Sequence, residues 1–168
     1  MLFRSARELI GYLPQEQRLA SGTLRQNLLL GLPDPGDEAI LSAAKQTGLF
    51  ELLSQNPRGL ALEISEGGRG VSGGQKQLIA LTRLILAAPR LWLLDEPTAS
   101  MDNEAEQRVV RMLKDEVQAA DTLIVATHKT AFLPMLTRLI VIREGRVAMD
   151  GPRDAVLAAL QGKAQPVA

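Results

Sequence analysis

The stretches Val71-Ser72-Gly73-Gly74-Gln75 and Leu91-Trp92-Leu93-Leu94-Asp95-Glu96-Pro97 decide the fold of this chain of 168 residues. An apolar segment joins them, and its spacing predicts one helix that runs to Ala87 and ends before Pro89. Ser72 and Gln75 have the spacing of a capping box, so Ser72 is the expected N-cap of that helix. The apolar residues before Asp95 predict a strand that is buried on both faces and ends in carboxylates.

Elsewhere, predicted strands alternate with predicted helices, which favours an α/β fold with a parallel sheet covered by helices. Residues 9–13 and 122–126 are the other expected sheet strands, and 122–126 is expected to be buried. Short amphipathic helices dominate the first half of the chain. Glu144-Gly145 predicts a hairpin turn, flanked by strands at 138–142 and 146–149 and followed by a helix at 152–160.

The composition excludes several classes of protein. Lys and Arg total 19 against 19 for Asp and Glu, so no net field attracts nucleic acid, and no nucleic-acid partner is expected. The absence of cysteine excludes a disulfide framework and a cysteine-based zinc site. No apolar run reaches the roughly 18 residues of a membrane span, so membrane association is expected through a partner and not by direct insertion.

The two opening stretches offer complementary groups for phosphate chemistry. Gly73 and Gly74 lack side chains, so amides at the helix start are open to an anion, and the Ser72 hydroxyl adds a donor. Asp95 and Glu96 lie at a strand end, where parallel sheets bind ligands. Phosphoryl transfer needs one carboxylate to hold Mg²⁺ and another group to orient water. Taken alone, the glycine pair would mark an ordinary helix start, and the two carboxylates would be a solvated acidic pair. The spacing between them favours a nucleotide site.

Five motifs, in family order, resemble those of the ABC transporter ATPases. Val71–Gln75 is similar to the signature motif, and Leu91–Pro97 is similar to the Walker B strand with its catalytic glutamate. Residues 99–102, Ala-Ser-Met-Asp, are similar to the D-loop. Gln15 falls where the family has its Q-loop glutamine, and His128 where it has the switch histidine.

The resemblance implies ATP and Mg²⁺ as ligands and assigns roles in the chain's own site. Asp95 would support Mg²⁺ together with Gln15, which would also sense the membrane subunit. Glu96 would polarise the attacking water, and His128 would contact the γ-phosphate. Glu96, His128 and Gln15 are therefore the candidate catalytic residues.

Other residues would act in trans. Ser72, Gly73, Gly74 and Gln75 would clamp the γ-phosphate of a nucleotide held by the opposite cassette, and Asp102 would order the dimer seam. The implied partners are a second ABC cassette and the transmembrane domains of an exporter.

One motif of the family is missing from the sequence. The phosphate-binding loop G-x-x-x-x-G-K-[ST], called Walker A, occurs nowhere, and the only Gly-Lys pair, Gly162-Lys163, is followed by Ala164. The implied fold is a P-loop NTPase-like (RecA-like) parallel sheet with helices plus the ABC helical subdomain, with the N-terminal strands and the Walker A helix missing. The expected division of residues 1–168, a partial ABC ATPase domain, is a mostly helical signature subdomain at 16–88, part of the RecA-like core at 9–15 and 89–161, and a tail at 162–168.

Segments near the signature favour an exporter. Glu66–Gly70 is similar to the segment by which exporter cassettes touch their membrane domains, and Ala20–Asn27 also resembles exporters. Residues 127–129 and 149–152 suggest type I secretion. The implied function is the coupling of ATP binding and hydrolysis to transport, at the cytoplasmic face of the cell membrane. Without Walker A the isolated chain is expected to be weak or inactive, so its status as an enzyme stays open.

Other functions share these motifs. A non-catalytic interaction subunit would complete a partner's ATP site through Ser72 and Asp102 without hydrolysing ATP in its own. A DNA-repair or chromosome-structuring ATPase would carry coiled coils or zinc-bearing insertions, whereas residues 15–72 predict only short helices and contain no cysteine. A degraded reading frame without activity is the third alternative.

The missing Walker A strand predicts a defect in the sheet. In related cassettes that strand lies between the ones expected here at 122–126 and 138–142. Each unsatisfied backbone group in an apolar interior costs about 1–3 kcal/mol. Either the two strands pair directly, another chain donates a strand, or the region is unstable. Fast amide exchange is expected at Leu123, Ile124 and Val125.

Overall fold

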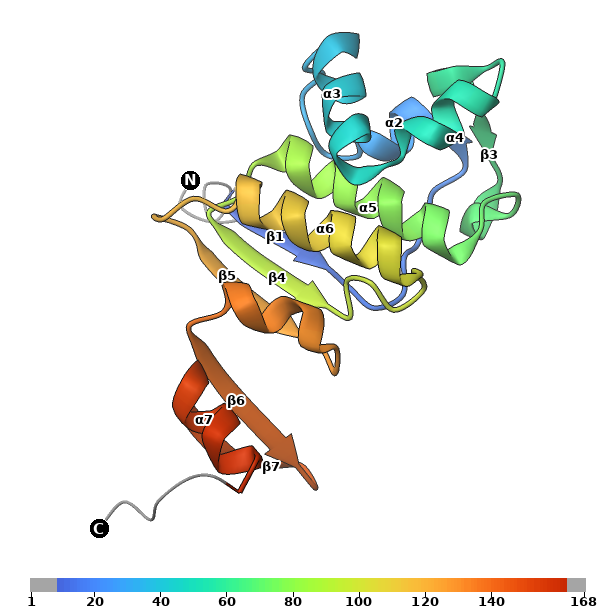
Figure 1. Ribbon diagram of the computed structural model, residues 1–168. Helices are drawn as coiled ribbons and strands as arrows, with labels where there is room; N and C mark the ends of the chain where they lie inside the picture. The colour runs from blue at the N-terminus through green and yellow to red at the C-terminus, as the bar shows by residue number, and fades with distance from the viewer. Residues whose placement is uncertain (1–8, 163–168) are drawn as a thin grey trace. The chain divides into compact units, whose positions relative to one another are not determined.

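The computed structural model describes residues 9–162, and the chain divides into a larger unit that ends at His128 and a smaller unit that begins at Lys129 (Figure 1). No helix within residues 9–162 is long and apolar enough to cross a bilayer.

A three-stranded parallel sheet forms the centre of the larger unit. It consists of β1 (Ile10–Leu13), β4 (Leu91–Asp95) and β5 (Thr122–Ala126), in the order β1-β4-β5. The strand β4 pairs with both neighbours. Because all three strands are parallel, their carboxyl ends lie at the same edge. The predicted α/β fold with a parallel sheet is confirmed.

Two long helices, α5 (Gly73–Ala87) and α6 (Asn103–Glu116), cover one face of this sheet (Figure 1). The side chains of Trp92 and Leu94, at alternate positions of β4, are only 2% and 3% exposed. The predicted extent of α5, up to Ala87, is confirmed. These two helices therefore place the signature stretch and the D-loop-like stretch against the strand that carries the acidic pair.

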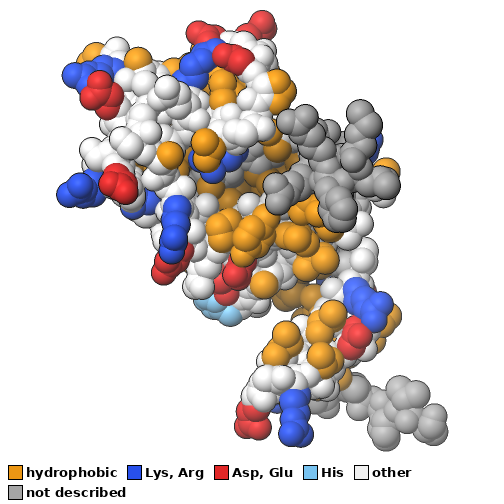
Figure 2. All heavy atoms as spheres, turned by 180° about the vertical axis from the view of Figure 1, so that it is seen from behind, with side chains coloured by type: hydrophobic (Ala, Val, Ile, Leu, Met, Phe, Trp, Pro, Cys, Tyr) orange, Lys and Arg blue, Asp and Glu red, His pale blue; other side chains and the backbone are white. Residues whose placement is uncertain are grey.

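The opposite face of the sheet is apolar and open. Ile10, Tyr12 and Ile124 are 44%, 62% and 55% exposed, and apolar side chains gather on the surface seen in Figure 2. Two expectations are therefore wrong, because only one face of β4 is fully buried and β5 is not a buried strand. The physical reason is that α5 and α6 cover one face of the sheet only, so the side chains on the opposite face stay partly exposed.

The segment between β1 and α5 is mostly helical. Its elements are α2 (Leu24–Leu28), α3 (Asp37–Thr47), α4 (Phe50–Gln55), the paired short strands β2 (Gly22–Thr23) and β3 (Glu63–Ile64), and the 3₁₀ turns η1 (Gly59–Ala61) and η2 (Glu66–Gly68). They pack around an apolar core of their own, which Ile79 of α5 joins. The division of the chain at residues 16–88 stays a prediction.

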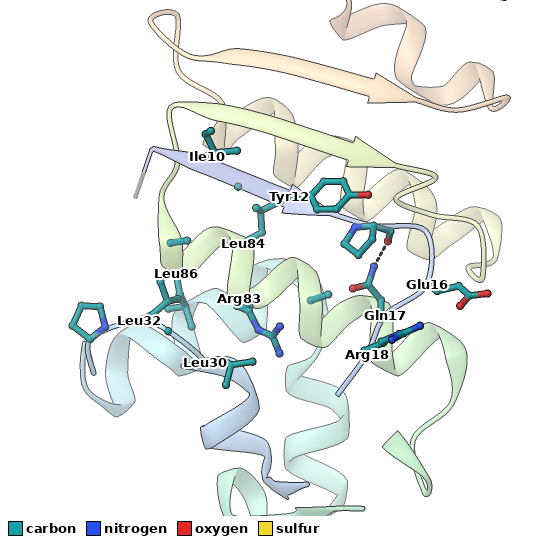
Figure 3. Close-up of a pocket in the computed structure, with 16 residues that line it drawn as sticks. Ile10, Tyr12, Glu16, Gln17, Arg18, Leu30, Leu32, Arg83, Leu84 and Leu86 are labelled. Atoms are coloured by element: carbon teal, nitrogen blue, oxygen red, sulfur yellow. Dashed lines mark hydrogen bonds between the residues drawn. The ribbon is translucent and has the colours of Figure 1, made fainter. Parts of the chain in front are cut away.

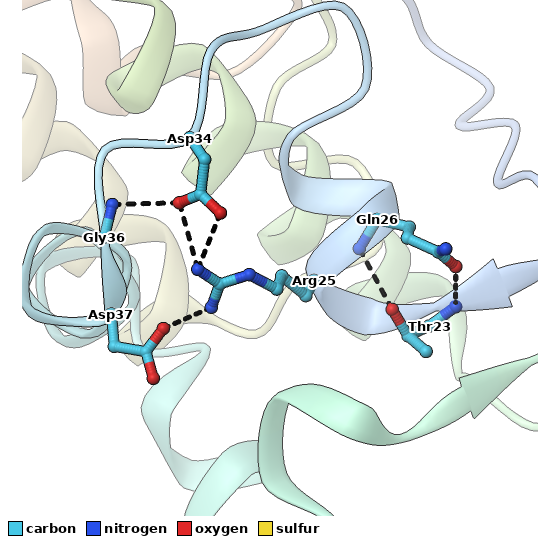
Figure 4. Close-up of polar contacts among 6 residues, drawn as sticks. All are labelled: Thr23, Arg25, Gln26, Asp34, Gly36 and Asp37. Carbon is cyan, nitrogen blue, oxygen red and sulfur yellow. Dashed lines mark hydrogen bonds and ion pairs between the residues drawn. The ribbon is translucent and has the colours of Figure 1, made fainter.

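Polar contacts fix α2 to the loop that follows it (Figure 4). Thr23 Oγ1 accepts the Gln26 N–H at 3.2 Å, and Gln26 Oε1 accepts the Thr23 N–H at 2.8 Å, which makes a capping box. Arg25 Nη2 donates to both carboxylate oxygens of Asp34, at 2.8 and 2.9 Å, and Arg25 also contacts Asp37. The hydrogen bond from Arg25 lowers the pKa of Asp34, so this ion pair stays formed at neutral pH.

The smaller unit is a β-hairpin with a helix packed on it. The 3₁₀ turns of η3 (Thr130–Met135) precede β6 (Arg138–Arg143) and β7 (Arg146–Pro152), which pair antiparallel, and α7 (Arg153–Leu160) follows. The predicted turn at Glu144-Gly145 is confirmed, with left-handed φ values of 48° and 72°. Within this unit β6 pairs with β7.

Candidate functional site

Polar side chains follow the three parallel strands at their carboxyl edge. The strand β1 leads to Gln15, β4 ends in Asp95 and continues into Glu96, and β5 leads into Thr127 and His128. Parallel sheets bind ligands at this edge because loops from neighbouring strands converge there. The structure thus brings the candidate residues of the chain's own site to one place.

Glu96 and His128 contact each other directly. Glu96 Oε1 lies 2.8 Å from His128 Nδ1 and accepts the His128 backbone N–H at 3.2 Å. Glu96 Oε2 accepts the Thr127 hydroxyl at 3.1 Å. The Glu96 side chain is 18% exposed and that of His128 is 77% exposed. The end of β5 therefore holds the carboxylate in place, while the imidazole stays accessible to a ligand.

The surroundings of Glu96 keep it ionised. Partial burial opposes ionisation, but the hydrogen bonds from His128 and Thr127 outweigh that effect, so the pKa of Glu96 lies below its ordinary value. The charged carboxylate is a strong acceptor and is suited to orienting a water molecule. Thr127 was not among the residues predicted for the site. Its hydroxyl directly after an apolar strand was the available signal.

The N-terminus of α5 presents open backbone amides. Ser72 Oγ accepts the Gln75 N–H at 3.2 Å and Gln75 Oε1 accepts the Ser72 N–H at 2.9 Å, so the predicted capping box is confirmed. The N–H groups of Gly73 and Gly74 have no acceptor among residues 9–162. A Cβ on Gly74 would lie 3.2 Å from the Ser100 carbonyl oxygen, so glycine allows this loop to approach the helix closely.

Asp102 has a structural role in the chain itself. Its Oδ1 accepts the Ala105 N–H at 2.8 Å, which makes Asp102 the N-cap of α6. The residue is exposed, so a partner can also reach it.

The protein offers few donor atoms for Mg²⁺. Asp95, half-buried at the end of β4, supplies a carboxylate, and Gln15, exposed after β1, supplies a carboxamide oxygen. Residues 9–162 contain no group of three or more His, Cys, Asp or Glu side chains that could hold a metal. Mg²⁺ accepts oxygen ligands and often keeps several waters beside one carboxylate and the substrate phosphates. The residues present therefore fit a nucleotide-bound Mg²⁺ and not a metal held by the protein alone.

A cavity of about 290 Å³ extends from Gln15 to the start of α5. Gly73, Gln77 and Ser100 are among the residues that line it. Gln77 was not singled out from the sequence, although a glutamine on the buried face of an apolar helix is the signal that could have found it.

A larger groove of about 1020 Å³ lies between β1, α5 and the loop after α2 (Figure 3). Tyr12 and Leu30 on its wall are 62% and 56% exposed. Arg83 also lines it, and Arg83 Nε donates to the Asn27 carbonyl at 2.8 Å. Arg83 Nη2 is buried without an acceptor in the described chain, and burial lowers the pKa of this guanidinium. The sequence did not predict the groove because its walls are far apart along the chain.

Known proteins resemble this chain over most of its length. It matches the ABC transporter family model over residues 3–99. It is 35% identical over 148 residues to the type I secretion system ATP-binding protein PrsD of Rhizobium meliloti (strain 1021), with 88% of this chain and 25% of that protein covered. It is 34% identical over 152 residues to the glutathione/L-cysteine transport system ATP-binding/permease protein CydC of Haemophilus influenzae, with 90% of this chain and 26% of that protein covered.

A solved structure of a bacterial Atm1-family ABC exporter with ATP bound matches with a TM-score of 0.82 and 26% identity, over 91% of this chain and 27% of that one. The chain therefore belongs to the ABC transporter family. Its fold matches that of an exporter's ATP-binding cassette, which confirms the ABC family predicted from the five motifs and the exporter branch predicted from Glu66–Gly70 and Ala20–Asn27. The chain spans between about an eighth and a quarter of the length of the curated relatives it matches.

Proposed function

We propose that this chain is the signature-bearing portion of an ATP-binding cassette of an ABC exporter, which couples ATP binding and hydrolysis to transport. The observation that carries the proposal is the open N-terminus of α5, where the amides of Gly73 and Gly74 have no acceptor in the described chain. Such amides bind phosphate because the helix dipole also favours an anion there. Ser72–Gln75 would clamp the γ-phosphate held by a second cassette, with Asp102 at the seam.

The strand-end residues would serve the chain's own nucleotide site. Glu96 would polarise the attacking water, since its carboxylate is ionised and fixed by His128 and Thr127. The exposed His128 imidazole would contact the γ-phosphate. Asp95 and Gln15 would hold Mg²⁺, which neutralises charge on the phosphates when bound.

The membrane domains of the exporter would be the second partner, and they would hold the chain at the cytoplasmic face of the membrane. The groove of Figure 3 is the surface that suits them, because Leu30 and Tyr12 on its wall are exposed apolar side chains. Leu30→Asp should weaken co-purification with an exporter membrane domain and leave nucleotide-dependent pairing of cassettes intact.

A mixing experiment tests the signature role. The partner is a cassette that keeps its Walker A loop but has an impaired signature, and this chain should restore part of its ATPase activity. Ser72→Asp should abolish the gain, because it keeps the N-cap but places a negative charge against the phosphate. Ser72→Thr, the matched control, keeps both the cap and the hydroxyl and should retain the gain. Equal activity with Ser72→Asp and Ser72→Thr would contradict the proposal.

A non-catalytic interaction subunit is the second candidate, which would complete a partner's ATP site through the open amides of Gly73 and Gly74 without hydrolysing ATP in its own. The two candidates differ in the chain's own site. If the chain is part of a catalytic cassette, adding a separately produced segment with a strand, a Walker A loop and its helix should restore ATP turnover to this chain. Glu96→Gln should then abolish that turnover. Turnover that never appears, while Ser72 still serves the partner, would favour the interaction subunit.

A further inference from the structure

The carboxamide of Gln77 joins two backbone segments of the site. Gln77 lies on α5, is 2% exposed, and lies five positions after the Ser72 cap. Its Nε2 donates to the Glu96 carbonyl at 2.8 Å, and its Oε1 accepts the Ser100 N–H at 3.3 Å. Both polar ends of one buried side chain are therefore used, and both reach the main chain of the loop after β4.

The Glu96 backbone has a conformation that needs support. Its φ is +46°, in the left-handed region that residues other than glycine seldom adopt. The Glu96 N–H donates to the Ala126 carbonyl at 2.8 Å, and the Glu96 carbonyl accepts from Gln77. The peptide groups on both sides of Glu96 are thus fixed, one by β5 and the other by α5. This arrangement directs the carboxylate toward His128 Nδ1, at 2.8 Å.

Ser100 connects the same side chain to the phosphate-facing end of α5. The Ser100 carbonyl oxygen lies 3.2 Å from where a Cβ of Gly74 would be, and its Oγ lies 3.5 Å from the corresponding position on Gly73. A shift of Ser100 would therefore press against the glycines whose amides are open. Gln77 holds the Ser100 N–H and so restrains that shift.

We propose that Gln77 is a positioning residue that sets the Glu96 carboxylate against His128 and fixes Ser100 against Gly73 and Gly74. The proposal rests on the proposed function only for the chemical task of Glu96. The geometry that carries it involves no nucleotide. A glutamine suits the position because one carboxamide both donates and accepts, whereas a glutamate carboxylate only accepts and a methionine thioether does neither well.

Three variants of the full chain separate the two contacts. Gln77→Met keeps the length of the side chain and loses both hydrogen bonds. At a pH at which its carboxylate is ionised, Gln77→Glu keeps an acceptor for the Ser100 N–H but cannot donate to the Glu96 carbonyl. Asn27→Leu is the matched control, since Asn27 is also a buried carboxamide, 1% exposed, with bonds to Ala20 in the helical segment.

NMR at one pH provides the readouts. His128 is the only histidine in the sequence, so its ring nitrogen resonances are unambiguous. Gln77→Met should move the His128 Nδ1 and amide resonances and speed amide exchange at Ser100 by about tenfold. Gln77→Glu should move the His128 resonances and leave Ser100 exchange near wild type. Asn27→Leu should change neither.

Unchanged His128 resonances in a folded Gln77→Met protein would overturn the proposal, as would equal changes in Asn27→Leu. If Gln77→Met fails to fold, Gln77→Glu alone tests the proposal. His128 resonances in Gln77→Glu that match those of wild type would then overturn it. If Gln77→Met changes the His128 resonances but the wild-type chain restores no ATPase activity in the mixing experiment, the proposed function is contradicted and the positioning role of Gln77 is supported.

Discussion

Glu96 is the residue on which most contacts of the site converge. Its carboxylate accepts three hydrogen bonds, from the side chain and backbone of His128 and from Thr127. Its own peptide groups bond to Ala126 and Gln77. Because hydrogen bonds fix both the carboxylate and the neighbouring peptide groups, the side chain keeps one orientation. A residue that positions a water molecule needs such a fixed orientation.

The lowered pKa of Glu96 makes stability depend on pH. Burial alone would raise that pKa, and the hydrogen bonds from His128 and Thr127 bring it below its ordinary value. A pKa that is lower in the folded chain than in the unfolded chain contributes stability above the unfolded-state value, and this contribution is lost as the pH falls through the folded-state value.

We therefore expect wild type to lose more free energy of unfolding than Glu96→Gln when the pH falls from about 5 to about 3. Urea denaturation of both proteins at each pH measures the difference. Equal losses in the two proteins would contradict the lowered pKa of Glu96 in the folded chain.

The sequence predicts contacts between near neighbours better than contacts across the fold. The capping box of Ser72 and Gln75 was predictable because a helix start needs only the residues within one turn. The contact between Glu96 and His128 was not predicted, although the family resemblance assigned both residues to one site. The bonds of Gln77 to the loop after β4 were not predictable, because they depend on how α5 packs on the sheet.

At the scale of elements, α5 is predictable along its whole length, and β5 is not. The capping box and Pro89 mark the ends of α5, and its apolar face has a sheet to cover. The strand β5 reads as a buried strand from its apolar residues, yet Ile124 is 55% exposed. Burial of a strand's side chains depends on what covers each face of the sheet, and α5 and α6 cover one face only.

The open edge of β5 predicts a specific pattern of amide exchange. The Thr122 N–H donates to the Arg90 carbonyl on the side of β4. Because strand amides alternate in direction, that of Ile124 also faces β4, whereas those of Leu123 and Val125 face the open edge. The sequence predicted fast exchange at all three amides, and the structure limits that prediction to Leu123 and Val125.

Leu123 and Val125 should therefore exchange much faster than Ile124, and hydrogen exchange followed by NMR resolves the three amides. Slow exchange at Leu123 and Val125 in a monomer would mean that another segment covers this edge.

For the whole molecule, the missing phosphate loop should dominate nucleotide binding. No G-x-x-x-x-G-K-[ST] occurs in the sequence to hold the β- and γ-phosphates. We expect the isolated chain to bind Mg²⁺-ATP weakly and to hydrolyse it negligibly. A titration with a fluorescent ATP analogue measures the affinity. Tight binding with turnover that Glu96→Gln abolishes would show that other residues hold the phosphates.

The central claim is that this chain supplies the signature half of a shared nucleotide site, and nucleotide-dependent association tests it most directly. The partner is a cassette with an intact Walker A loop and an inactivated catalytic glutamate, so that ATP stays bound. Analytical ultracentrifugation should detect a one-to-one complex with Mg²⁺-ATP but not with Mg²⁺-ADP, and Ser72→Asp should abolish it while Ser72→Thr retains it. A complex that forms equally without nucleotide, or that Ser72→Asp leaves intact, would contradict the account.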